Sequence, residues 1–288
     1  MSMFKKAVKS QAKLRLGIYG PSGSGKTYTS LQIASALGSP VAVIDTENAT
    51  ASKYSDVYGF DCLNLIDCSP KNFIAAIKDA EKDYPTIVID SLSHAWVGEN
   101  GALQQVEKET LRSGNSFSSW KNVTPQVDAL RDAIIRCKAD IICTFRSKNS
   151  TVLETNDKGK KVPRIVGLEP VYKDKIEYEF DVFARLDESG NFIVQKTRAP
   201  KLIDGVFNRD GVAVAKLLRE WLNTGAPIEK DLNIDSLCAM LASAVSLDDL
   251  RTAWLAIKAE QDAGMLSEFA WNHLTVAKDE KKEELAKS

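Results

Sequence analysis

Residues 20–27 of the chain read GPSGSGKT, which matches the phosphate-binding loop pattern G-x-x-x-x-G-K-[ST]. An apolar run from Leu14 to Tyr19 precedes the loop, and a helical pattern from Thr29 to Leu37 follows it. Such a loop works between a buried strand and the first turn of a helix, so it constrains the chain to an α/β fold. Its glycines let successive backbone N–H groups point into one cavity, which suits the phosphates of a nucleoside triphosphate.

The side chains of this loop have separate tasks. We expect Lys26 to reach the β- and γ-phosphates and the Thr27 hydroxyl to ligate Mg²⁺. The helix that begins near Lys26 adds the positive end of its dipole to the same cavity. The predicted nucleotide-binding residues of this segment are Gly20, Pro21, Ser22, Gly23, Ser24, Gly25, Lys26, Thr27 and Tyr28.

Composition narrows the classes of protein that the chain can belong to. Its 288 residues are 44% hydrophobic and carry a formal net charge of -1, so contact with nucleic acid has to come from local patches. The five cysteines form no C-x-x-C pair, which indicates reduced thiols and predicts a cytoplasmic location. With two histidines and no Cys/His cluster, a zinc site is not expected. The sequence shows no signal peptide and no apolar run of about 18 residues, so no membrane contact is expected.

From Leu14 to about Leu222, short apolar runs alternate with helical patterns, which predicts βα units and a mainly parallel sheet covered on both faces. The expected strands are 14–19, 41–45, 62–66, 86–90 and 140–145. Further helices are expected to begin at Ser69-Pro70 and at Thr124-Pro125, with proline as the first helical residue. After Phe145, hairpin signals join 151–154 to 162–166 and 179–186 to 192–196.

Four segments are predicted along the chain. Residues 1–13 form a basic N-terminal arm, 14–222 the nucleotide-binding core, 223–231 a linker with Gly225 and Pro227, and 232–288 a small α-helical domain. Within the last segment, Ser246 to Asp249 reads as a capping box that opens a helix.

Hydrolysis at a phosphate-binding loop also needs a carboxylate for the Mg²⁺ shell and a group that positions water. Asp90 ends the apolar strand 86–89 and is the candidate for the metal shell. Ser91 follows it, where many ring-forming ATPases have a catalytic glutamate. Glu47, just past the strand 41–45, is a candidate substitute, because ligands bind at the carboxyl ends of parallel strands. The alternative for Glu47 is a residue that only caps a loop.

Four segments together resemble, in order and spacing, the ATPase core of RecA-like recombinases: Asp45 to Ala49, Ile89 to Ser91, Ile141 to Arg146 and Val194 to Pro200. The resemblance covers roughly residues 14–205 and is greatest to the phage-encoded RecA-like ATPases that act in single-strand annealing. It implies a RecA-like P-loop core with C-terminal β-hairpins. It also implies ATP and Mg²⁺ as cofactors, and a host-cytoplasmic location if the chain is phage-encoded.

The resemblance also assigns roles to single residues. Glu47 matches the catalytic glutamate, and Tyr54 stands where a tyrosine stacks on adenine. Arg146 falls where the family has a glutamine that senses the γ-phosphate, so a guanidinium would take that role. Lys196 and Arg198 match paired cations that reach the ATP of the adjacent subunit in a ring or filament. From the residues alone, the simpler interpretation is that Lys196 and Arg198 are two exposed basic side chains at the end of a strand.

DNA contact is expected in the segments after Asp90 and after Arg146. The second, 147–175, holds seven Lys or Arg against four Asp or Glu, a local charge of +3, which suits a single-stranded phosphate backbone. The first segment, Ser91 to Asn122, contains Trp96 and Trp120. These tryptophans either stack on bases or pack in the core, and the sequence does not decide between the two. A solvated hairpin is the alternative for 147–175. The predicted DNA-binding residues are Lys158, Lys160, Lys161, Arg164 and Tyr172.

The sequence therefore predicts a DNA-stimulated ATPase that oligomerises on single-stranded DNA and promotes annealing or strand exchange. The stretch from Phe4 to Ala7 resembles the F-x-x-A motif by which strand-exchange recombinases dock one subunit onto the next. Three alternatives stay open: a helicase or helicase loader, a P-loop small-molecule kinase, and a nucleotide-dependent interaction protein. In the last, the C-terminal helices recruit a partner such as a single-strand-binding protein.

Overall fold

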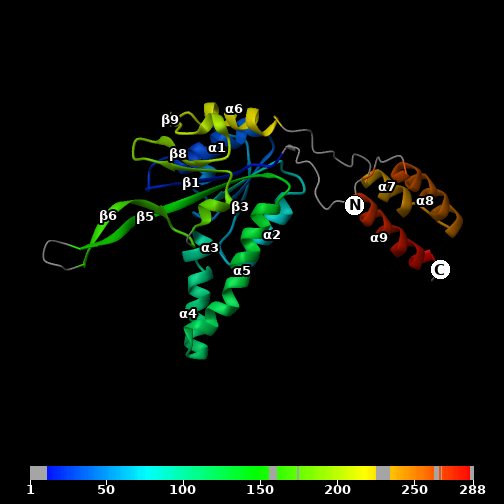
Figure 1. Cartoon of the computed structure of the whole chain (residues 1–288), viewed down its shortest axis with the longest axis horizontal. Coiled ribbons are helices and arrows are strands. Elements are labelled where there is room, and N and C mark those ends of the chain that lie inside the picture. Colours follow the sequence, from blue (N-terminus) through cyan, green and yellow to red (C-terminus); the bar gives the residue numbers. More distant parts are fainter. Residues whose placement is uncertain are drawn as a thin grey trace. The chain divides into compact units, whose positions relative to one another are not determined.

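The computed structural model describes residues 12–155, 161–173, 175–224, 234–262, 266 and 268–285 (Figure 1). The chain divides into two compact units, one spanning residues 11–225 and the other containing residues 226–288. The motif Phe4 to Ala7, together with Lys158 and Lys160, lies outside the described residues. No helix among the described residues is long and apolar enough to cross a membrane.

The first unit is built on a mostly parallel sheet, as the βα alternation predicts. Nine strands make up this sheet in the described residues, in the order β3-β2-β4-β5-β1-β7-β8-β9, and β6 pairs with β5 off this path. The parallel strands are β1 (Arg15–Gly20), β2 (Val41–Asp45), β3 (Asp61–Asn64), β4 (Thr86–Asp90), β5 (Asp140–Thr155) and β7 (Val182–Leu186). The antiparallel strands are β6 (Lys161–Pro170), β8 (Asn191–Thr197) and β9 (Val206–Asn208).

Helices cover both faces of this sheet (Figure 1). On one face, α1 (Lys26–Leu37) and α6 (Gly211–Leu222) bury Leu31, Ile33, Val214 and Leu218 against the strands. On the other, α2 (Pro70–Ala80) and α5 (Ser116–Arg136) bury Phe73, Ile77, Leu130 and Ile134. Burial of apolar side chains on both faces explains why the strands read as continuous apolar runs.

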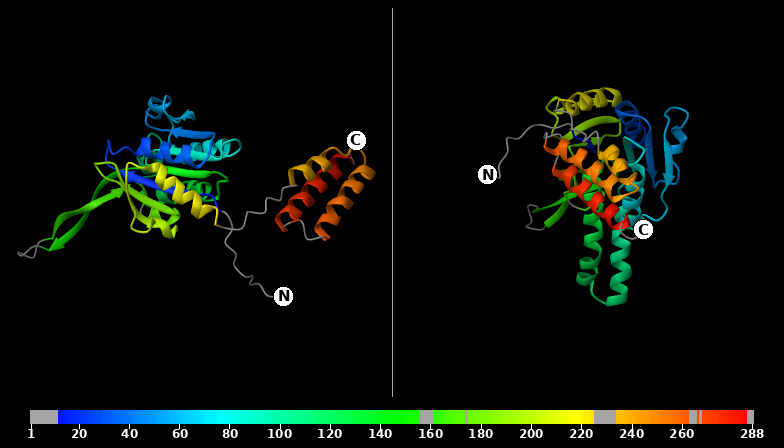
Figure 2. Two further views of the ribbon diagram at one scale, coloured as in Figure 1. Left: turned by 90° about the horizontal axis from the view of Figure 1, so that it is seen from above. Right: turned by 90° about the vertical axis from the view of Figure 1, so that its right-hand side faces the viewer.

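Two hairpins project from this unit (Figures 1 and 2). The outer part of β5 and β6 form an antiparallel ribbon, here called the β-arm (residues 147–155 and 161–170). After the short helix α3 (His94–Val97), α4 (Ala102–Ser113) and α5 form a helical hairpin. Trp96 and Trp120 pack beside Val106 and Val123 between these helices, which favours the core-packing interpretation of both tryptophans.

The predicted start of α5 is wrong. The helix begins at Ser116, where the Asn115 side chain accepts hydrogen bonds from the backbone N–H groups of Phe117 and Ser118, and Pro125 lies inside it. Pro125 is on the exposed face, whereas Val123 and Val127 are buried. Continuous packing of the buried stripe outweighs the hydrogen bond that an interior proline removes.

Two strand predictions also differ from the structure. The expected strands 140–145 and 151–154 are one strand, β5, which pairs with β1 up to Arg146 and has a register shift between Ser150 and Thr151 in its pairing with β6. The expected strand 179–186 begins only at Val182, because Ile176–Glu179 form a 3₁₀ turn, η2. Each difference lies where the chain leaves the sheet.

The described residues of the second unit form three helices, α7 (Ile234–Ala242), α8 (Leu247–Asp262) and α9 (Glu268–Leu285). Leu237, Leu250, Ile257 and Leu274 lie in their shared core. The predicted capping box is confirmed: Ser246 Oγ accepts from the Asp249 N–H at 3.1 Å and donates to Asp249 Oδ2 at 2.8 Å.

The start of β1 is fixed to the end of α5 by one buried cation. The Arg15 guanidinium donates to the backbone carbonyls of Leu14 at 2.8 Å, Ala139 at 2.9 Å and Ile135 at 3.0 Å, and also to that of Cys137. The last carbonyls of a helix have no partner within it, so Arg15 supplies a donor to the carbonyls of Ile135 and Cys137 at the end of α5.

Replacing Arg15 with methionine should therefore destabilise the first unit. We expect Arg15→Met to lower its free energy of unfolding by roughly 3 kcal/mol, because several buried carbonyls lose a charged donor. Urea unfolding followed by circular dichroism measures the change, and Lys13→Met, at an exposed position two residues away, is the matched control. Equal stability of the two variants would contradict this role.

Candidate nucleotide-binding site

The parallel register brings the ends of four strands to one cavity. Gly20 at the end of β1 pairs with Arg146 on β5, and Asp45 at the end of β2 pairs with Asp90 on β4. The cavity at this edge has a volume of about 610 Å³. Its lining residues are Gly20, Ser22, Gly23, Gly25, Lys26, Thr27, Glu47, Thr50, Tyr54, Asp90, Arg146 and Ser147. The phosphate-binding loop and both candidate carboxylates therefore face one space.

The loop itself has the geometry that phosphate binding requires. A Cβ on Gly20 would lie 2.5 Å from the Leu186 carbonyl oxygen, and Gly25 has a φ of 89°, so both positions need glycine. Lys26 Nζ donates to the carbonyls of Gly20 at 2.9 Å and Pro21 at 2.8 Å, which places the ammonium over the loop. Ser24 Oγ is buried without a hydrogen-bond partner.

Thr27 and Asp90 meet at the floor of the cavity. The Thr27 hydroxyl donates to Asp90 Oδ2 at 2.5 Å, and the Thr144 hydroxyl donates to the other carboxylate oxygen. Burial raises the pKa of Asp90, which these two hydrogen bonds oppose. The oxygen donors fit Mg²⁺, which takes one or two protein oxygens and completes its shell with phosphates and water. The described residues contain no cluster of three or more His, Cys, Asp or Glu side chains that could hold a metal by themselves.

Glu47 is held in place from two sides. Asp45, buried at the end of β2, accepts the Glu47 N–H on Oδ1 at 2.6 Å and the Ala51 N–H on Oδ2 at 2.9 Å, which fixes the loop backbone. The carboxylate of Glu47 pairs with Arg146 through two hydrogen bonds, from Nε to Oε1 at 2.9 Å and from Nη2 to Oε2 at 2.7 Å. Burial raises the pKa of Glu47, but the hydrogen bonds and charge of Arg146 outweigh it, so the pKa is lowered.

Aromatic rings lie beside the phosphate loop. Tyr54 lines the cavity, whereas Tyr28, on the first turn of α1, packs edge-on against Tyr54 at 5.7 Å and against Tyr58 at 5.6 Å between ring centroids. Of these three rings, Tyr54 is the one that lines the cavity, and Tyr28 contacts it.

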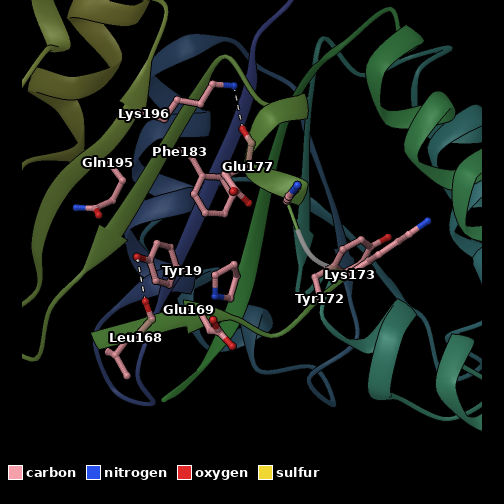
Figure 3. A pocket seen from close by; sticks show the side chains of 11 residues that line it. Tyr19, Leu168, Glu169, Tyr172, Lys173, Glu177, Phe183, Gln195 and Lys196 are labelled. Carbon is pink, nitrogen blue, oxygen red and sulfur yellow. Dashed lines mark hydrogen bonds between the residues drawn. The ribbon is translucent and has the colours of Figure 1, made fainter. Parts of the chain in front are cut away.

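Lys196 and Arg198 both have partners within the chain. Lys196 Nζ donates to the carbonyls of Glu177 at 2.9 Å, Tyr178 at 2.9 Å and Phe180 at 2.5 Å, so all three of its N–H groups are used (Figure 3). Arg198 makes one ion pair, to Asp181 at 2.8 Å, and its side chain is 57% exposed. Of the two predicted cations, Arg198 is therefore the one that can meet a neighbouring phosphate without breaking the η2 turn.

The predicted DNA-binding residues divide between surface and core. Lys161 and Arg164 lie on β6 in the β-arm, where Arg164 pairs with Glu154 at 2.8 Å. The expectation that Tyr172 stacks on a base conflicts with its position: it is 6% exposed and packs against Phe145 and Trp96. Figure 3 shows Tyr172 among the side chains around a second cavity, at the inner end of the β-arm. The Tyr172 ring is therefore part of the hydrophobic core. The basic composition of the surrounding sequence does not show that this tyrosine is buried.

Sequence reasoning missed several residues of this site. Asp45 and Thr144 are buried polar side chains within apolar strands. Asp45 accepts the Glu47 N–H, and Thr144 donates to the Asp90 carboxylate. His94 is buried beside Glu47, with Nε2 at 3.9 Å from Oε1. A polar residue at the end of a buried strand was the available signal for Asp45. No sequence signal placed His94 beside Glu47, because they meet only after folding.

Removing Arg146 should raise the pKa of Glu47. The guanidinium stabilises the carboxylate, so in Arg146→Ala the proton is retained to higher pH, and Glu47 titrates above its position in the parent chain. Carboxyl ¹³C NMR across a pH series, with Glu47→Gln as the assignment variant, measures the shift. Arg164→Ala removes a similar surface pair on the β-arm and should leave the Glu47 titration unchanged. An unchanged pKa in Arg146→Ala would show that the pair does not form in solution.

Comparison with known proteins agrees with this geometry. A family model described as an AAA domain matches residues 12–205, which covers β1 to β8, the phosphate-binding loop and every residue that lines the nucleotide cavity. No curated protein matches the chain. The chain therefore belongs to the AAA domain family of P-loop ATPases.

Proposed function

We propose that this chain is a RecA-like ATPase that oligomerises on single-stranded DNA and promotes annealing or strand exchange in phage recombination. One observation carries the proposal: β5 contributes Arg146 to the nucleotide cavity and continues directly into the β-arm. Because one strand belongs to both, DNA that binds the β-arm could change the position of Arg146, which holds the Glu47 carboxylate. A metabolite kinase has no use for such a ribbon.

In the proposed reaction, ATP occupies the cavity lined by the phosphate loop. Lys26 and the loop N–H groups bind the phosphates, and Thr27 with Asp90 would hold Mg²⁺, which neutralises charge on the phosphate oxygens. Glu47 orients the attacking water and accepts its proton. Tyr54 contacts the adenine ring.

Arg146 has two possible partners in this site. In the structure its guanidinium pairs with Glu47, and the paired carboxylate is a weak base because its pKa is lowered. A γ-phosphate in the cavity competes for the same guanidinium through charge-assisted hydrogen bonds. Transfer of Arg146 to the phosphate releases Glu47 for catalysis.

The β-arm is the proposed DNA contact. The β-arm lies within the segment 147–175, which carries a local charge of +3 from seven basic against four acidic residues. Contacts to a phosphate backbone at Lys158, Lys160, Lys161 and Arg164 would be transmitted along β5 to Arg146. The C-terminal helical unit is a candidate surface for a single-strand-binding protein.

ATP hydrolysis with and without single-stranded DNA tests the proposal. The parent chain should hydrolyse ATP faster with DNA, Lys26→Ala should lose ATP binding, and Glu47→Gln should bind ATP but turn over about 100-fold more slowly. The triple variant of Lys158, Lys160 and Lys161 to glutamine should keep the DNA-free rate and lose the stimulation.

Two outcomes would count against this function. Hydrolysis that is indifferent to DNA, with no DNA binding at low salt, rejects the recombinase assignment. Normal turnover in Glu47→Gln removes Glu47 from its catalytic role. In the triple variant, the slope of affinity against salt concentration should also fall, because each phosphate contact that is lost reduces counterion release.

A mixing experiment tests whether Arg198 acts on the ATP of a neighbouring subunit. Lys26→Ala lacks a working phosphate loop, and Arg198→Ala lacks the cation, so each alone should be inactive. Mixed oligomers contain interfaces in which an intact loop meets an intact Arg198, and these should recover part of the activity. Asp181→Asn, which frees Arg198 from its ion pair, is the control and should remain active. No recovery on mixing would contradict the action in trans.

A further inference from the structure

His94 lies next to Glu47 on the side away from the phosphate loop. Its side chain is 11% exposed, and its Nε2 is 3.9 Å from Glu47 Oε1. Both side chains line a third cavity, of about 240 Å³, and Glu47 and Arg146 line both this cavity and the nucleotide cavity. A nitrogen-to-oxygen distance of 3.9 Å is longer than a hydrogen bond, so the ring and the carboxylate are neighbours that are not bonded to each other in this arrangement.

The backbone around His94 is firmly held. The preceding residue, Ser93, accepts the Arg146 N–H on its hydroxyl oxygen at 2.9 Å, which ties the start of α3 to β5. The Leu92 N–H donates to the Thr144 carbonyl at 2.9 Å. The imidazole therefore sits on a fixed frame, which is what a positioning residue requires.

The Thr46 hydroxyl contacts the other ring nitrogen of His94. Its oxygen accepts the Ser91 N–H at 2.8 Å, and it lies 3.1 Å from the Ser91 carbonyl oxygen and 2.6 Å from His94 Nδ1. In one arrangement of this network the Thr46 hydroxyl donates to Nδ1. A neutral imidazole that accepts on Nδ1 carries its hydrogen on Nε2, and this N–H faces Glu47. Burial, and next the charge of Arg146, lower the pKa of His94, which agrees with a neutral ring.

We infer that His94, fixed by Thr46 as the Nε2–H tautomer, positions the Glu47 carboxylate for catalysis. The inference rests on the proposed function of Glu47. When Arg146 moves to the γ-phosphate, the Glu47 carboxylate loses both of its hydrogen bonds to Arg146. A carboxylate that rotates freely cannot hold the attacking water in a fixed orientation. The Nε2–H then closes the remaining gap to Oε1 and holds one oxygen, while the other faces the nucleotide cavity. His94 thus replaces Arg146 as the partner of Glu47, without adding a positive charge that would weaken the base.

The tautomer can be measured without any activity. The chain contains two histidines, so long-range ¹H–¹⁵N NMR of the parent protein resolves both rings, and His94→Gln assigns the signal of His94. We expect a protonated Nε2 and an unprotonated Nδ1 at neutral pH. A protonated Nδ1 would leave no donor toward Glu47 and would overturn the inference, even if ATP hydrolysis is normal.

Two substitutions then separate positioning from packing. Glutamine places its amide nitrogen as many bonds from Cα as imidazole Nε2, whereas asparagine matches Nδ1, so only His94→Gln keeps a donor toward Glu47. We expect His94→Asn to lower kcat by about tenfold to a hundredfold at unchanged KM and ATP affinity, and His94→Gln to recover most of the rate. Equal kcat values for the two variants would reject the role.

Glu47→Gln provides the last control. In that background His94→Asn should cost nothing further, because the group that it positions is already lost. Additive losses would mean that His94 acts elsewhere. If Glu47→Gln itself turns over normally, the proposed role of Glu47 fails. If Glu47→Gln is slow while His94→Asn is normal, only the role of His94 fails.

Discussion

Parallel pairing of β1, β5, β4 and β2 is the constraint on which the site depends. It places the carboxyl ends of all four strands at one edge, so that residues from distant parts of the sequence become neighbours. Glu47 and Arg146 are 99 residues apart in sequence, yet they share two hydrogen bonds. Register matters as much as strand order, because a shift by one residue would turn Asp90 or Arg146 to the opposite face of the sheet.

The buried carboxylate of Asp90 shows how the fold tolerates charge at this edge. Desolvation penalises the ionised form, and hydroxyl hydrogen bonds from Thr27 and Thr144 compensate only in part, so its pKa remains raised. A divalent cation would remove the remaining penalty, because it stabilises the ionised carboxylate directly. The carboxylate is therefore costly for the protein alone and is stabilised in a complex with Mg²⁺.

Much of this fold follows from local sequence signals, whereas the site follows only in part. The phosphate loop and the strands that end at Asp45 and Asp90 are predictable, because apolar runs with polar ends read clearly as buried parallel strands. The start of α5 is not, since proline usually marks a first turn and only the packing against α4 carries the helix through Pro125. Tyr172 and His94 show the same limit. Their neighbours come from distant parts of the chain that meet only when the sheet and helices pack together. The amino-acid sequence around each residue therefore does not show which side chains it contacts.

The continuity of β5 connects these features. Its inner half is the central strand between β1 and β4, and its outer half forms the β-arm with β6, so Arg146 stands at the junction of a rigid sheet and an exposed ribbon. A register shift between Ser150 and Thr151 lets the ribbon bend without disturbing the pairing of Gly20 with Arg146. The Ser93 hydroxyl accepts the Arg146 N–H, and the Val171 N–H donates to the Arg146 carbonyl. Arg146 is therefore the residue at which the sheet, the start of α3 and the end of β6 meet, and its guanidinium holds Glu47.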